Sequence, residues 1–105
     1  MIVATTEHIP GREVTEVLGL VQGNSVRARH VGRDIMAAFK NLVGGEIKEY
    51  GRLQAESRAQ AQQRMLERAR ELGADAVIGI RFATSMITAG ASEILAYGTA
   101  VKLSS

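Results

Sequence analysis

The longest stretch of the chain without a helix breaker includes residues 53–72, which contain neither glycine nor proline. It predicts one long helix within residues 46–72, ended by Gly73 as a capping residue. Small and apolar side chains recur along this helix at helical spacing and mark the face that we expect to be buried: Ala55, Ala59, Leu66 and Ala69, widened by Ala61, Met65 and Leu72. Because this stripe is rich in alanine, the helix can lie close to a sheet.

Four other segments have the β-branched and apolar residues that are typical of strands. They are residues 1–5, 14–26, 76–87 and 93–103. Gly19 and Gly23 predict a bend or a bulge in the second of these strands.

The last two strands predict a hairpin with a two-residue turn at Ala89-Gly90. That turn would pair Phe82 with Tyr97 and Arg81 with Gly98, and it would place the two aromatic rings on one face of the sheet. The opposite face would then be lined by small and apolar residues: Val77, Ile87, Ile94, Ala96, Gly98 and Ala100.

The order of elements predicts a single two-layer α+β domain over residues 1–105, with a β-α-β-β antiparallel sheet and the long helix on one face. A shorter helix is expected over residues 34–42, between Asp34 as its N-cap and the glycine pair at Gly44-Gly45. Because one helix layer covers only one face of a sheet, the apolar second face predicts self-association.

The most basic stretch, "VRARHVGRD" at residues 26–34, contains three arginines and a histidine. The chain as a whole has 13 basic and 11 acidic residues, a near balance, and no aromatic residue lies within this stretch for base stacking. We therefore interpret it as the end of the long strand and the start of a helix, with no nucleic-acid partner. The absence of an apolar run of membrane-spanning length and of a visible secretory signal predicts a cytoplasmic protein without a membrane partner.

Metal ligands are few. The chain has no cysteine, and its two histidines, His8 and His30, are 22 residues apart. The candidate metal ligands are His8, His30 and Asp34, which form no complete site in one chain, although a ring of subunits could gather several copies of one histidine.

No nucleophile–base constellation is apparent, so we do not expect an enzyme. Several polar residues lie in otherwise apolar stretches and are candidates for a subunit interface or a ligand site: Tyr50, Arg58, Arg81, Glu93 and Tyr97. Arg81 is expected to pair with a carboxylate, either Glu93 or Asp75.

Five stretches together resemble the YbjQ-like family of small bacterial and archaeal proteins, which is labelled "putative heavy-metal-binding". They are "PG" at residues 10–11, "VGRDI" at 31–35, "GGEIKEY" at 44–50, "LGADAVIGIRF" at 72–82 and "EILAYGTAV" at 93–101. The resemblance implies a dodecin-like subunit that assembles into a pentameric ring, or into two stacked rings. Its label implies, as the alternative function, a heavy-metal ion bound at a site formed in the oligomer.

Overall fold

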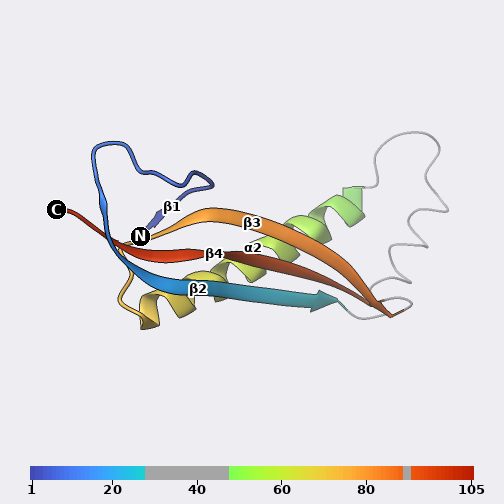
Figure 1. The fold of residues 1–105 in the computed structure, drawn as a ribbon. Helices are drawn as coiled ribbons and strands as arrows, with labels where there is room; N and C mark the ends of the chain where they lie inside the picture. The colour runs from blue at the N-terminus through green and yellow to red at the C-terminus, as the bar shows by residue number, and fades with distance from the viewer. Residues whose placement is uncertain (28–47, 89–90) are drawn as a thin grey trace.

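The computed structural model describes residues 1–27, 48–88 and 91–105. Within these residues the chain forms four strands and one helix (Figure 1). In chain order they are β1 (Ile2–Val3), β2 (Val14–Arg27), α2 (Lys48–Glu71), β3 (Ala76–Thr88) and β4 (Ala91–Leu103). The long helix and the three long strands are confirmed, whereas the short helix expected over residues 34–42 lies outside the described residues.

The strands form one sheet in the order β1-β3-β4-β2. The pairs β2–β4 and β3–β4 are antiparallel, but β1 pairs with β3 in parallel. The sheet is therefore mixed, and the prediction of a purely antiparallel sheet is wrong. The reason lies in the long connection between the two strands, since β2 and α2 both come between β1 and β3 and allow the chain to return in the same direction.

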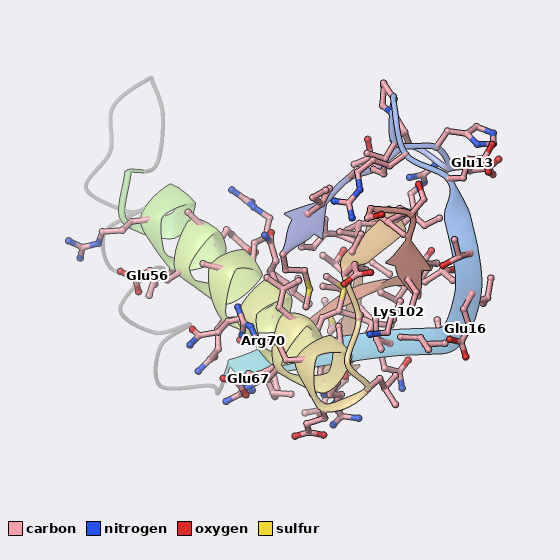
Figure 2. The ribbon with its side chains drawn as sticks, turned by 90° about the vertical axis from the view of Figure 1, so that its left-hand side faces the viewer. Glu13, Glu16, Glu56, Glu67, Arg70 and Lys102 are labelled. Atoms are coloured by element: carbon pink, nitrogen blue, oxygen red, sulfur yellow. The ribbon has the colours of Figure 1, made fainter. Side chains whose placement is uncertain are left out.

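The helix α2 lies on one face of the sheet and contacts mainly β2, then β4, and hardly β3. Its buried side chains recur at every fourth position: Ser57, Ala61, Met65 and Ala69. Ala55, Ala59 and Leu72 of the predicted stripe are exposed. The charged side chains Glu56, Glu67 and Arg70 lie on the outer surface of the helix (Figure 2).

Gly23 is the point of closest approach between α2 and the sheet. A Cβ atom built on Gly23 would lie 2.3 Å from the backbone nitrogen of Met65 and 2.5 Å from the carbonyl oxygen of Ala61. Only a residue without a side chain fits beneath the helix here. The bulge expected in β2 is confirmed next to Gly19, whose φ is +130° and where the pairing with β4 shifts between Val17 and Gly19. The pairing is regular at Gly23.

The register of the β3–β4 hairpin differs from the prediction. Thr88 pairs with Ala91, so two residues separate the last pair, but a bulge follows at once and Met86 pairs with Ser92. As a result Phe82 faces Ala96, and Tyr97 faces Arg81. The predicted pairs of Phe82 with Tyr97 and of Arg81 with Gly98 are wrong, because one extra residue in a strand moves every following side chain to the other face.

This shift exchanges the two faces of β4 relative to the prediction, whereas Ile80 and Phe82 remain on the helix side. The main core beneath α2 is built from the residues that were expected on the open face, since Val77, Ile94, Ala96 and Ala100 are buried there together with Val21 and Ile80. Small side chains on β4 let the helix approach, whereas the ring of Tyr97 points to the helix-free face.

A second, smaller cluster lies on the helix-free face at one end of the sheet. Ala76, Val101 and Leu103 are buried there beneath Ile2 and Ile9 of the N-terminal segment. The rest of this face has exposed apolar side chains. On β2 the most exposed of them are Leu20 (68%) and Val17 (66%). An apolar helix-free face is therefore present, although its residues differ from those predicted.

Candidate functional site

Two of the predicted interface or ligand residues, Arg81 and Tyr97, are direct cross-strand neighbours on the helix-free face. Arg81 is exposed and Tyr97 is partly buried. One terminal nitrogen of the Arg81 guanidinium donates hydrogen bonds to the carbonyl oxygens of Thr5 (3.0 Å) and Ile80 (2.8 Å). Arg81 thus ties the N-terminal segment to β3 at the point where β1 has ended.

The carboxylates expected to pair with Arg81 have other partners. Oε2 of Glu93 accepts a hydrogen bond from the side-chain amide of Asn24 at 3.0 Å. Oδ2 of Asp75 accepts one from the backbone N–H of Leu103 at 2.9 Å. The expected pairing of Arg81 with Glu93 or Asp75 is therefore replaced by bonds to backbone carbonyls, which the N-terminal segment brings within reach.

Glu93 and Tyr97 share the helix-free face, because they are four positions apart on β4. The rise of a strand separates them by roughly 13 Å. Arg58 is exposed on α2, which lies on the opposite face. The side chain of Tyr50 lies outside the described residues. The structure therefore brings Arg81 and Tyr97 together, and it leaves Glu93 and Arg58 apart from them.

The metal candidates do not form a described site. His8 is exposed in the loop before β2, and its carbonyl oxygen accepts a hydrogen bond from the Thr6 hydroxyl at 2.7 Å. His30 and Asp34 lie outside the described residues. Over residues 1–27, 48–88 and 91–105, no three side chains of the histidine, cysteine, aspartate or glutamate type are grouped so that they could hold a metal ion. The donors described within one subunit thus do not fit a heavy-metal site.

The feature that sequence reasoning missed is the exposure of the second half of β3. All eight residues from 81 to 88 are exposed, including Phe82 (43%), Met86 (80%) and Ile87 (56%). A signal was present in the sequence, since "FATSMIT" at residues 82–88 has high β-propensity and contains neither a charge nor a proline.

The strands on either side of β4, which are β2 and β3, differ from it in exposure. In β4, every residue except Ser92 is at least partly buried. In the described part of the chain, five large apolar side chains in strands are at least half exposed. All of them belong to β2 or β3: Val17, Leu20, Val26, Met86 and Ile87. No helix of the described part is long and apolar enough to cross a lipid bilayer.

Comparison with known proteins places this architecture in a family. Residues 1–104 match the YbjQ family model, whose description is "Putative heavy-metal-binding". A UPF0145 protein from Archaeoglobus fulgidus is 57% identical over 103 residues, which cover 98% of this chain and 95% of the relative. A UPF0145 protein from Vibrio campbellii is 60% identical over 103 residues, which cover 98% of this chain and 99% of the relative.

Among solved structures, the chain is similar to a protein of unknown function from Pediococcus pentosaceus that belongs to the DUF74 family. The TM-score is 0.67, the match covers 99% of this chain and 98% of that chain, and the sequences are 18% identical. At this level of identity the likeness supports the fold alone.

Proposed function

Because the chain belongs to the YbjQ family, we propose that its working form is a homo-oligomer, a ring of five copies or two stacked rings of five. The number five comes from the family resemblance. The need for further copies follows from the apolar surface that one subunit leaves exposed.

The observation that carries this proposal is the exposure of β2 and β3, the strands on either side of β4. Leu20 (68%) on β2 and Met86 (80%) on β3 are the most exposed of the five large apolar side chains that these strands leave at least half exposed, and a grouping of such side chains marks an interaction surface. Burying the exposed part of such a side chain contributes about 1–2 kcal/mol. With the other three half-exposed apolar side chains of these strands, each subunit could gain several such contributions from its neighbours.

The polar candidates fit the same assembly. Arg81 and Tyr97 lie side by side on the helix-free face, and Glu93 lies further along it. In the ring they would border a contact between subunits, or a ligand held between subunits. Arg58, on the surface of α2, would serve a contact on the other face, and Tyr50 remains a candidate for either role.

Native mass spectrometry of the tag-free protein, without added metal, tests the assembly. The proposal expects a species of five or ten times the subunit mass of 11.3 kDa. A monomer at micromolar concentration would overturn it.

The family description makes metal binding the second candidate. His8 is the one described ligand candidate, and a ring would bring several copies of it around one axis. The same spectrum tests this idea, because a bound ion adds mass that a chelator removes and that His8→Ala abolishes. An assembly whose mass equals the sum of its subunits would count against a resident metal.

A further inference from the structure

One edge of β3 is covered along only half of its length. The N-terminal segment pairs with residues 76 and 77 and then follows the strand, since the N–H of Gly79 donates to the carbonyl of Thr6 (2.9 Å) and that of Ile80 donates to the carbonyl of Ala4 (3.2 Å). Beyond Ile80, no described residue pairs with this edge. Residues 81–88, all exposed, therefore form an edge strand that is open in the described part of the chain.

The backbone of this open edge is ready to accept another strand. Because the N–H of Ile80 points away from β4, the alternation of a β-ladder directs the N–H and C=O groups of Phe82, Thr84 and Met86 to the same side. Natural edge strands are commonly protected by charged residues or proline. Residues 82–88 contain neither.

The opposite edge of the sheet offers a strand of matching length. β2 pairs with β4 on one side, and no described residue pairs with its other side over residues 20–27. These eight residues pair with β4 without a bulge, and the exposed run of β3 is also eight residues long. Since β2 and β3 are both antiparallel to β4, they run parallel to each other within one chain.

The position of α2 distinguishes β2 from β3 as the partner strand. Phe82, Thr84 and Met86 face the helix side of the sheet, but α2 lies over β2 and β4 and leaves them uncovered. If β3 paired with β3 of a second copy, the added strand would bring no helix beside these side chains, because the α2 of that copy lies over its own β4 and β2. If β2 of a second copy paired with it, the helix of that copy, which lies over β2, would come beside these three side chains.

We infer that the open edge of β3, residues 81–88, binds the β2 edge of a second copy of this chain, residues 20–27, as a parallel extension of the sheet. This inference rests on the proposed homo-oligomer and specifies its contact. The contact is head-to-tail, because it joins two different edges, and repetition around an axis closes a ring. The α2 of each copy then covers Phe82, Thr84 and Met86 of its neighbour.

Disulfide trapping tests this contact, because the natural chain has no cysteine. Ser85 and Gln22 are exposed and point to the helix-free face, opposite Glu93 and Tyr97 respectively. Within one chain β4 separates β2 from β3, and Glu93 and Tyr97 are four residues apart along it. The Cα atoms of Ser85 and Gln22 are therefore roughly 16 Å apart, which is beyond the reach of a disulfide. Between copies, adjacent strands would bring them to about 5 Å.

Ser85→Cys is therefore combined in turn with Leu20→Cys, Gln22→Cys, Asn24→Cys and Val26→Cys, which span the possible registers on that face. One of the four double variants should form a ladder of covalent multimers on mild oxidation, analysed by non-reducing gel electrophoresis. Two variants serve as controls and should remain largely uncrosslinked. One is Ser85→Cys alone. The other combines Ser85→Cys with Glu67→Cys, which places a thiol on the outer surface of α2.

The outcomes separate this contact from the assembly itself. If native mass spectrometry shows a ring but no double variant forms the ladder, the β2–β3 contact is wrong and the proposed function stands. Covalent dimers of Ser85→Cys alone would indicate β3–β3 pairing and would also overturn the inference. A monomeric natural protein would overturn both.

A second variant avoids dependence on disulfide geometry. Met86→Glu places a charge at a side chain that is 80% exposed in the subunit, so the fold should be retained, as circular dichroism can verify. We expect at least a tenfold loss of assembly at a fixed subunit concentration. Unchanged assembly would show that the β3 edge is not the contact, including the case in which residues 28–47 of the same chain occupy it.

Discussion

Replacing Gly23 with alanine tests how closely α2 rests on the sheet. The new methyl group would meet the nitrogen of Met65 at 2.3 Å and the carbonyl oxygen of Ala61 at 2.5 Å. These two atoms are four residues apart in the helix and form one of its backbone hydrogen bonds. Because the obstacle is backbone, no rotation of a side chain can relieve the clash.

The cost follows from the distance that the helix must move. Ordinary van der Waals contact begins at 3.4 Å, so α2 must rise by about 1 Å above Gly23. A gap of this size loses a quarter to a half of each dispersion contact across it. For Met65 and the alanines beside it, which are fully buried, we estimate a loss of about 3 kcal/mol, at the upper end for an overpacked core. Alanine also lowers the conformational entropy of the unfolded chain, which stabilises the folded state by about 0.4–1 kcal/mol. The net destabilisation is therefore roughly 2 kcal/mol.

Urea denaturation followed by circular dichroism, at one fixed subunit concentration, measures this loss. For a chain of this size, 2 kcal/mol lowers the midpoint by about 1–2 M urea. Gly51→Ala is the matched control, because Gly51 lies in α2 with open space where its Cβ would be. It should raise the stability by about 0.5–1 kcal/mol through helix propensity. If Gly23→Ala left the midpoint unchanged or raised it, the close seating of α2 on β2 would be refuted.

Three further substitutions test other contacts by the same urea titration. Gly98→Ala should lower the free energy of unfolding by about 1–3 kcal/mol, because its Cβ would lie 2.8 Å from a methyl group of Val77 and 3.0 Å from the carbonyl oxygen of Ile78. A stabilised variant would contradict this packing. Asp75→Ala should cost about 1–2 kcal/mol by leaving the N–H of Leu103 without its carboxylate acceptor, whereas Asp75→Asn keeps an acceptor and should cost less; equal losses would argue against the bond. Ser25→Ala should cost about 1 kcal/mol, since it removes the donor of the 2.9 Å bond to Oε1 of Gln60 at a position that is 1% exposed; no loss would mean that water replaces the hydroxyl.

Part of the candidate site could be foreseen from residue types. Arg81 and Tyr97 were recognisable as polar residues in apolar strands, and the structure places them opposite each other. The partners of Arg81 could not be foreseen, because the carbonyl of Thr5 reaches it only through the path of the N-terminal segment along β3. The arrangement at Glu93 likewise depends on Asn24, which is 69 residues away in the chain.

Local sequence determined the elements themselves. The breaker-free stretch before Gly73 and the runs of β-branched residues predicted α2 and the three long strands to within about two residues of their observed ends. These features depend on backbone propensity and on apolar periodicity, which act over a few neighbouring residues. The alanine-rich helix was also expected to lie close to the sheet, as the contact at Gly23 confirms.

The tertiary structure alone decided which face the helix covers and which edge remains open. The irregularities of β3 between Ile78 and Arg81 and at Ile87 move the following side chains to the other face, and such a shift depends on how two strands pair. The parallel pairing of β1 with β3 depends likewise on the whole chain, and it covers the β3 edge only as far as Ile80. Pairing between distant strands is not encoded by local propensity, so the open edge of β3 at residues 81–88 could be identified only from the folded chain.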